Sequence, residues 1–268
     1  MKAIDRARPL AASKLAMDAR SPLEIRLSQH LALTYAERDA LRWLERRERS
    51  YRAGAVLIRE GEPSGDLFIV SSGWLHGSIS PAPGVRQILR FYFRGDITTT
   101  FSIAWGYSAA TLTAVSNCTV FTVERDAFGR LFQEHPRIGA LLYAVSASEE
   151  VAMADRLMSV GRTAGMNRVA TLLLDIRSRL LVTGELEEAT FELPLTQQEL
   201  GDAVGLTKAH INRTLKALEA TGLIERQGRL IRITDVESLA QMVDFKDRHR
   251  HVATEWLPPV RSQPAAVT

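Results

Sequence analysis

Residues 195–224 constrain the fold more than any other part of the chain. They read LTQQELGDAVGLTKAHINRTLKALEATGLI. Leu200 and Val204 share one face of a first expected helix, and Gly205 follows where the chain must turn sharply, a position that suits the wide conformational range of glycine. Thr207 is a good N-cap for a second helix. This order of helix, glycine turn, N-cap and helix predicts a helix-turn-helix.

The second expected helix has two different faces. Ile211, Leu215 and Leu218 recur at three- and four-residue spacing and form a buried stripe. The opposite face carries cationic and amide side chains at i, i+4, i+5 and i+8, namely Lys208, Asn212, Arg213 and Lys216. Such side chains can neutralise phosphates and hydrogen-bond to guanine or adenine edges. The face is therefore typical of a helix that lies in a DNA major groove, although many amphipathic helices expose a polar face to solvent alone.

The residues after the second helix predict a β-hairpin. Residues 225–234 read ERQGRLIRIT, in which a turn at 226–229 separates two short strand-like runs. A hairpin in this place is the wing of a winged helix-turn-helix domain.

Bulk composition narrows the class of protein. The chain has 268 residues, of which 46% are hydrophobic and 24% charged, and a net charge of +3; this is ordinary for a globular protein of about two domains. The sole cysteine, Cys118, cannot form an internal disulfide, which is typical of a reducing, cytoplasmic location. No stretch approaches the ~20 apolar residues that span a bilayer, and the N-terminus lacks the apolar core of a secretory signal. No membrane association is therefore expected.

The N-terminal half has the texture of a β-domain. Between residues 51 and 123, short runs rich in Val, Ile, Phe, Tyr and Thr alternate with turns at 61–63, 72–73, 81–84 and 95–96. Many short strands at this spacing predict an antiparallel sandwich or barrel. Ahead of it, Thr34 and Glu37 have the spacing of a capping box at the start of a helix.

A long helix is expected at 136–162. Its apolar residues are Ile138, Leu141, Leu142, Val145, Val151, Leu157 and Met158. This stripe is longer than one small domain needs to cover, so pairing with the same helix of a second copy is its expected use. The alternative is packing against the β-domain of the same chain. A homodimer also suits the twofold symmetry of helix-turn-helix binding.

The order of these parts resembles the Crp/Fnr family of bacterial transcription regulators. Besides the helix-turn-helix, VGRTAGMNRVATLLLDI (160–176) is similar to the family's segment between the dimer helix and the DNA-binding domain, and REGEPSGDLFIVSSG (59–73) is similar to its glycine-punctuated strand pair. The resemblance covers roughly residues 25–240. It implies an α+β fold, with an N-terminal antiparallel β-roll that is cyclic-nucleotide-binding-like, a long dimerisation helix and a C-terminal winged helix-turn-helix.

Five regions follow from this organisation. They are a flexible N-terminal segment at 1–22, a β-roll sensor-like domain at 23–135, the dimerisation helix at 136–162, a winged helix-turn-helix DNA-binding domain at 163–245 and a disordered tail at 246–268.

The resemblance implies DNA contacts from both helices of the motif. Thr196 and Gln198 are expected to touch the DNA backbone, Lys216 a phosphate, and the remaining residues the bases. The full predicted set is Thr196, Gln198, Thr207, Lys208, Ala209, His210, Asn212, Arg213 and Lys216.

Two of these positions bear on the DNA sequence that is read. Arg213 stands where the family has its most regular guanine-reading arginine. Many members carry a glutamate where this chain has Ala209, which can offer only a methyl contact, for example to thymine, and His210 is a candidate to contribute instead. The half-site of the better-known members is therefore not expected.

The β-domain departs from the cyclic-nucleotide members. These hold the ribose and cyclic phosphate with a Gly-Glu pair and a following Arg-Ser or Arg-Thr, where this chain has threonines at 99–100 and Ser-Ala at 108–109. No arginine lies between Arg94 and Arg125, and a buried phosphate needs a cation or converging N–H groups. Cyclic AMP or GMP is therefore not expected as the effector. The candidates for another polar effector are Thr98, Thr99, Thr100 and Ser108; the alternatives are that these are ordinary strand residues and that there is no effector.

No cofactor or metal is expected. The cysteines that hold an iron–sulfur cluster near the N-terminus of oxygen-sensing members have no counterpart here. His76 is a lone candidate for a haem ligand, and a lone histidine is more often an ordinary polar residue. Cys118 lies in an apolar-alternating run and is expected to be buried and inert.

Three classes of function were compared. The predicted class is a homodimeric DNA-binding regulator with double-stranded DNA and RNA polymerase as partners. The alternative is a small-molecule-binding or protein-interaction module without sequence-specific DNA binding, which the basic helix face disfavours. An enzyme is not expected, because the sequence has no paired carboxylates, nucleophile motif, metal-ligand spacing or phosphate loop.

Overall fold

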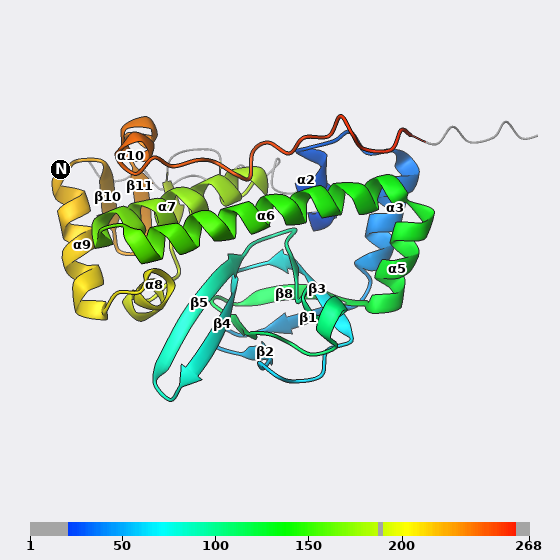
Figure 1. The fold of residues 1–268 in the computed structure, drawn as a ribbon, viewed down its shortest axis with the longest axis horizontal. Helices are drawn as coiled ribbons and strands as arrows, with labels where there is room; N and C mark the ends of the chain where they lie inside the picture. Colours follow the sequence, from blue (N-terminus) through cyan, green and yellow to red (C-terminus); the bar gives the residue numbers. More distant parts are fainter. Residues whose placement is uncertain (1–20, 187–189, 261–268) are drawn as a thin grey trace, which may run out of the picture.

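The β-domain consists of two antiparallel sheets with a shared core. The computed structural model describes residues 21–186 and 190–260. One sheet has the order β1-β8-β3-β6 and the other β2-β7-β4-β5 (Figure 1). The strands are β1 Glu48–Tyr51, β2 Val56–Ile58, β3 Asp66–Ser72, β4 Leu75–Ala82, β5 Val85–Tyr92, β6 Ile97–Thr98, β7 Thr111–Ala114 and β8 Cys118–Glu124. Apolar side chains alternate inward from both sheets, as with Val70 and Val120 from one and Leu75 and Leu112 from the other, which is the pattern of a sandwich.

One glycine fixes the link between the two sheets. Gly73 lies between β3 and β4 with φ 75°, and a Cβ there would clash with the backbone of Asn117 and Cys118. Only glycine meets both demands without strain. The turn that the sequence predicts at 72–73 is therefore confirmed.

Helices flank the β-domain on one side. They are α2 Pro22–Ser28, α3 Tyr35–Leu44, the short α4 Ser102–Trp105, and α5 Arg125–Glu134. The predicted capping box at α3 is present: the Thr34 hydroxyl accepts from the N–H of Glu37, and the Glu37 carboxylate accepts from the N–H of Thr34. Leucines of α2 and α3 pack with Phe128 of α5 and Leu141 of the next helix in one cluster, which anchors these helices to the sandwich.

The long helix α6, Pro136–Arg162, covers the residues that the sequence predicts for it, and its role in dimerisation stays a prediction. After an elbow at Thr163 and Ala164, α7, Gly165–Val182, runs back beside it (Figure 1). The remaining elements are β9 Thr190–Glu192, α8 Gln197–Val204, α9 Lys208–Ala220, β10 Ile224–Gln227, β11 Leu230–Ile233 and α10 Val236–Met242. The second part of the chain is thus a helical domain with a three-stranded sheet of order β10-β11-β9, and the predicted α+β architecture is confirmed.

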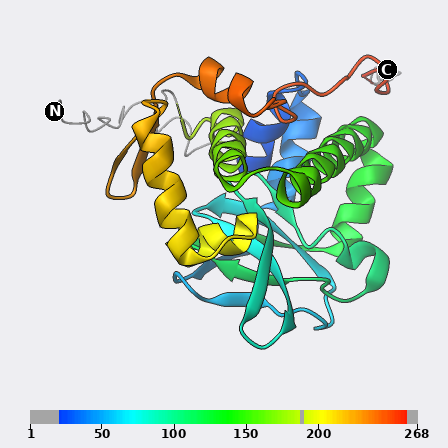
Figure 2. The same ribbon diagram turned by 60° about the vertical axis from the view of Figure 1, so that its left-hand side comes forward.

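The two parts share a core. Trp74, Ile88 and Phe93 of the β-domain belong to the same buried cluster as the apolar residues of α7, α8 and α9. In Figure 2, α8 lies beside the strands of the β-domain while α9 lies along the outside. The helix-turn-helix is therefore held against β5 through α8.

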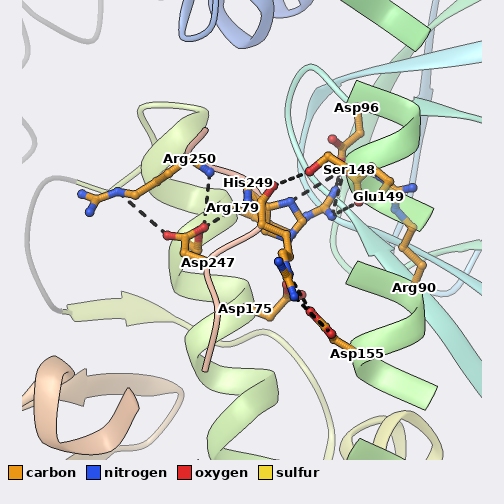
Figure 3. Close-up of polar contacts among 12 residues, drawn as sticks. Arg90, Asp96, Ser148, Glu149, Asp155, Asp175, Arg179, Asp247, His249 and Arg250 are labelled. Carbon is orange, nitrogen blue, oxygen red and sulfur yellow. Dashed lines mark hydrogen bonds and ion pairs between the residues drawn. The ribbon is translucent and has the colours of Figure 1, made fainter. Parts of the chain in front are cut away.

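The predicted disordered tail is wrong for residues 246–260. The Ser148 hydroxyl of α6 donates to the carbonyl of Arg248, and Arg248 pairs with Asp155 at 2.7 Å (Figure 3). His249 is buried and lies 2.8 Å from Asp175 of α7. The prolines at 258–259 suggested disorder, but buried polar partners on α6 and α7 hold this segment.

Further along the tail, Leu257 packs on the cluster formed by the N-terminal helices. Residues 261–268 of the predicted tail lie outside the described residues. The predicted flexible segment at 1–22 also lies outside them, except for Ser21 and Pro22. Ser21 is the N-cap of α2 and accepts from the N–H of Glu24 at 3.0 Å, so flexibility is wrong for these two residues.

Candidate nucleic-acid interface

The turn between α8 and α9 is built as the sequence predicts, with one addition. Thr196 caps α8 in a capping box with Glu199, and Gly205 ends α8 with φ 69°. Gly201 was not singled out by sequence reasoning. A Cβ at this position would clash with the carbonyl oxygen of Leu206, so Gly201 lets the turn fold closely over α8. The signal was a helix-interior glycine, which is unfavourable unless packing requires it.

The helix α9 separates its apolar and polar faces clearly. Ile211, Leu215 and Leu218 are buried against the rest of the domain. The side chains of Lys208, Ala209, Asn212, Arg213 and Lys216 are exposed on the other face. No hydrogen bond or ion pair among the described residues engages these exposed side chains. The predicted base-facing residues thus share one open face and are free to meet a ligand.

Two residues at the start of α9 have different positions. Thr207 is the N-cap and accepts from the N–H of His210 at 3.3 Å. The His210 ring lies against the elbow, where its Nε2 would be 3.2 Å from a Cβ built on Gly165. The ring therefore packs toward the start of α7, at the edge of the face that carries Asn212.

The two residues predicted to touch the DNA backbone lie next to the β-domain. The Gln198 amide donates to Asp202 at 2.6 Å, and Asp202 in turn pairs with Arg86 of β5 at 2.7 Å. Thr196 lines a cleft between the β-domain and the helical domain, together with Trp74 and Arg229. The structure thus places these two residues apart from the open face of α9, at the junction that orients α8.

The wing adds cations that sequence reasoning did not assign. β10 and β11 form the predicted hairpin, with Gly228 at φ 64° in its turn. Arg229 at the tip is exposed, whereas Arg226 pairs with Glu219 of α9 at 2.7 Å. The exposed tip is the position from which a wing reaches a neighbouring phosphate, and its arginine next to a glycine turn was the available signal.

The helical domain is tied to the β-domain by a buried network of charges. Glu149 of α6 accepts from Arg179 of α7 at 2.9 Å and from Arg90 of β5 at 2.8 Å (Figure 3). Burial alone would raise the pKa of Glu149, but the charges of Arg179 and Arg90 outweigh it and hold the pKa well below its usual value. The carboxylate is therefore ionised and links three elements.

The candidate effector residues serve the backbone of their own loop. Thr98, Thr99 and Ser108 are buried and Thr100 is exposed. The Thr99 hydroxyl donates to the carbonyl of Thr98 at 2.6 Å, and the Ser108 hydroxyl donates to the carbonyl of Ala110 at 2.7 Å. Thr99 also has φ 59°, which is uncommon for a β-branched residue. Effector binding by these four residues stays a prediction.

The two other candidates of the β-domain are buried. Burial raises the pKa of the Cys118 thiol to about 11, so the thiol is protonated and unreactive at neutral pH. His76 is fully buried, and neither ring nitrogen has a hydrogen-bond partner in the described part of the chain. Within residues 21–186 and 190–260, no three His, Cys, Asp or Glu side chains are grouped to hold a metal ion. The helices of those same ranges also lack the length and apolar character that crossing a bilayer requires.

Comparison with known proteins separates the chain into the same two parts. Residues 48–135 match the model of the cyclic nucleotide-binding domain, and residues 167–242 match that of the Crp-like helix-turn-helix domain. The transcriptional activator protein anr of Pseudomonas aeruginosa is 23% identical over 205 residues, which cover 76% of this chain and 84% of that protein.

Two further proteins are similar over most of the chain. The nitrogen fixation regulation protein FixK of Azorhizobium caulinodans is 29% identical over 181 residues, covering 63% of this chain and 70% of FixK. The solved structure of FixK2 from Bradyrhizobium japonicum superposes with a TM-score of 0.65 at 28% identity, covering 72% of this chain and 95% of FixK2.

Proposed function

Because this chain belongs to the Crp/Fnr family of transcription regulators, we propose that it is a homodimer that reads a near-palindromic DNA site. Each α9 enters the major groove of one half-site, and the half-sites lie about one helical turn apart. RNA polymerase is the further partner through which a bound regulator changes transcription.

The open face of α9 is the observation that carries this proposal. Its cations and amide project from a helix whose other face is buried, and none of them is neutralised by a neighbour in the described residues. Cations left free on a surface helix raise the affinity for phosphates and make it dependent on salt. A protein-interaction module without DNA binding would have no use for this arrangement.

The dimer is proposed from the exposed face of α6. Side chains at alternating four- and three-residue spacing point away from the rest of the chain: Tyr143, Ala147, Glu150, Ala154 and Leu157. Tyr143 is 70% and Leu157 75% exposed, which is costly for large apolar groups on one stripe. The spacing is that of a coiled-coil seam, so a second α6 is the natural cover.

The preference for bases is proposed to differ from that of the better-known members. Arg213 reads a guanine, and Ala209 offers a methyl group where many members have a glutamate. The control of the protein is also proposed to differ, because the cations of a cyclic-phosphate clamp and the cysteines of an iron–sulfur cluster are missing from the positions of the sequence where the family has them. Neither cyclic AMP nor an iron–sulfur cluster is proposed as its control.

Selection of random double-stranded DNA by the purified full chain tests this function. A twofold-symmetric motif, enriched without any added effector, is the expected result. The Arg213→Ala variant run in parallel should lose one base preference in each half-site. Folded protein that enriches no motif, either alone or after addition of cell extract to supply an effector, would overturn the proposal and favour the interaction module.

A further inference from the structure

A cavity of about 140 Å³ lies between α6 and α7. On one side it is closed by β5 and the end of α8, at Leu89 and Val204. On the other side it is closed by the chain that follows α10, at Phe245 and Lys246. Five parts of the sequence therefore meet around it, and it is distinct from the loop at 98–108 considered above.

The cavity lies on the face of α6 opposite to the proposed dimer seam. Ala152, Arg156 and Ser159 line the cavity, whereas Ala154 and Leu157 belong to the exposed stripe. At 100° per residue these two sets point in nearly opposite directions. Dimerisation through α6 would thus leave the cavity in place.

The wall of the cavity contains two arginines without a carboxylate partner. Arg156 donates to the carbonyls of Ile88 at 3.1 Å and Ala203 at 3.0 Å, and Arg168 donates to the carbonyl of Thr163 at 2.9 Å. Among the ion pairs of the described residues, which extend to 4.0 Å, neither guanidinium takes part. Both charges are satisfied only by neutral backbone groups.

The acidic residues of the wall are all paired. Glu149 binds Arg179 at 2.9 Å, Asp155 binds Arg248 at 2.7 Å, and Asp175 contacts His249 at 2.8 Å (Figure 3). Asp244 has Lys246 at 3.7 Å. The positive charge that remains around the cavity therefore belongs to the two unpaired arginines.

Burial makes the charge on Arg156 costly. Desolvation lowers the pKa of Arg156 to about 10, so the guanidinium stays charged at neutral pH. A buried cation is ordinarily paired with an anion. The geometry leaves that anion to be supplied from outside the chain.

The rest of the wall is apolar. Met153, Val160, Leu172 and Phe245 face the space beside Arg156. A dry cavity of about 150 Å³ holds a benzene molecule in another protein, so this one has room for a single ring or a branched aliphatic group of similar size. Flexible methionine side chains adapt readily to such a guest.

We propose that this cavity binds a small organic anion, a monocarboxylate with one compact apolar group, whose carboxylate pairs with Arg156. The apolar group lies between α6 and α7. Because Arg156 bridges β5 and α8 through Ile88 and Ala203, the carboxylate sits at the junction of the β-domain and the helix-turn-helix.

Calorimetric titration of the full chain with benzoate tests the proposal. Benzoate is expected to bind saturably with one molecule per chain, and the uncharged benzamide about tenfold or more weakly, because the charge-assisted hydrogen bond is lost. Arg156→Met should remove the preference for benzoate. Since this variant also loses two backbone contacts, Ala152→Leu provides a second test that fills the cavity and keeps the guanidinium.

The matched control is Arg162→Met, which removes an exposed arginine of the same helix that does not line the cavity. Its affinity for benzoate should equal that of the parent chain. No saturable binding of benzoate, equal affinity for benzoate and benzamide, or unchanged binding in the Ala152→Leu variant would each overturn the proposal. The titration contains no DNA, so its result is independent of the proposed DNA-binding function.

Discussion

The guanidinium of Arg179 on α7 lies 2.5 Å from the carboxylate of Asp96 in the turn before β6. Arg26 of α2 holds the other carboxylate oxygen at 2.9 Å, and all three side chains are almost completely buried. Burial alone raises the pKa of Asp96, but the charges of Arg179 and Arg26 outweigh it and hold the pKa below its usual value. One carboxylate thus joins the N-terminal helix, the β-domain and the helical domain.

Replacing this carboxylate should be strongly destabilising. Asp96→Ala leaves Arg26 and Arg179 buried without their shared partner, which costs about 3–5 kcal/mol in comparable cases. Urea unfolding followed by circular dichroism measures the loss. Asp39→Ala is the control, because its pair with Arg42 is exposed and such pairs contribute about 1 kcal/mol or less. Equal effects of the two substitutions would contradict a central role for Asp96.

The closeness of α8 to its turn predicts a second stability effect. Gly201→Ala places a methyl group against the carbonyl of Leu206 and should cost about 1–3 kcal/mol, as overpacking commonly does. Gly129→Ala in α5 is the matched control, since its Cβ would meet no atom within 4 Å and alanine favours the helix by up to about 1 kcal/mol. The two alanines should therefore shift the melting temperature in opposite directions.

Arg213 should affect specificity more than general affinity. Arg213→Ala removes a base-reading side chain from the open face of α9 and should cost about 1–3 kcal/mol on the selected site while relaxing the preference at one base pair. Fluorescence anisotropy with the selected duplex and its single-base variants measures both effects. An equal loss on all duplexes would show that Arg213 meets only phosphate.

Lys216 is expected to behave in the contrasting way. Lys216→Ala should weaken binding to all duplexes alike and flatten the dependence of log K on log salt by about one unit per chain. Titrations at several salt concentrations measure the slope. A change confined to one base pair would instead assign Lys216 to base reading.

The exposed stripe of α6 predicts the effect of a charge on assembly. Leu157→Glu places carboxylates of two chains against each other in the proposed seam and should convert the dimer to monomer, with a loss of affinity for the palindromic site. Sedimentation velocity reports the state of assembly. Val85→Glu is the control, because Val85 is also exposed but lies in the β4–β5 hairpin. A parent chain that sediments as a monomer would contradict the seam.

The buried imidazole of His76 predicts a loss of stability in acid. Burial, helped by the charge of Arg86, lowers the pKa of His76 from 6.5 to about 4. The unfolded chain therefore binds a proton that the folded chain refuses, and stability falls as the pH drops from about 6.5 to 4. At about 1.4 kcal/mol per pKa unit, this residue accounts for about 3 kcal/mol.

His76→Leu removes the titrating group and should flatten the dependence of the unfolding free energy on pH over that interval. Urea unfolding at a series of pH values measures the slope. His251→Leu replaces an exposed histidine and should follow the parent chain. An unchanged slope in the His76→Leu variant would assign the acid sensitivity to other groups.

The sequence by itself determined the elements that local chemistry specifies. Thr34 with Glu37, and Gly205 with Thr207, act over a few residues, so their spacing alone predicts the helix starts and the turn that the structure contains. Apolar periodicity likewise identified α6 and the buried face of α9, because it reports which side of a helix must be covered.

Only the tertiary structure decided what covers each face. Arg86 meets Asp202 across 116 residues of sequence, and Arg156 meets Ile88 across 68. The tail was expected to be disordered from its composition, yet His249 finds Asp175 on α7. Periodicity shows that a surface must be buried but not its partner, and a charge acquires a partner only when distant elements pack together. The fixed junction of α8 with β5 and the cavity beside Arg156 follow from that packing.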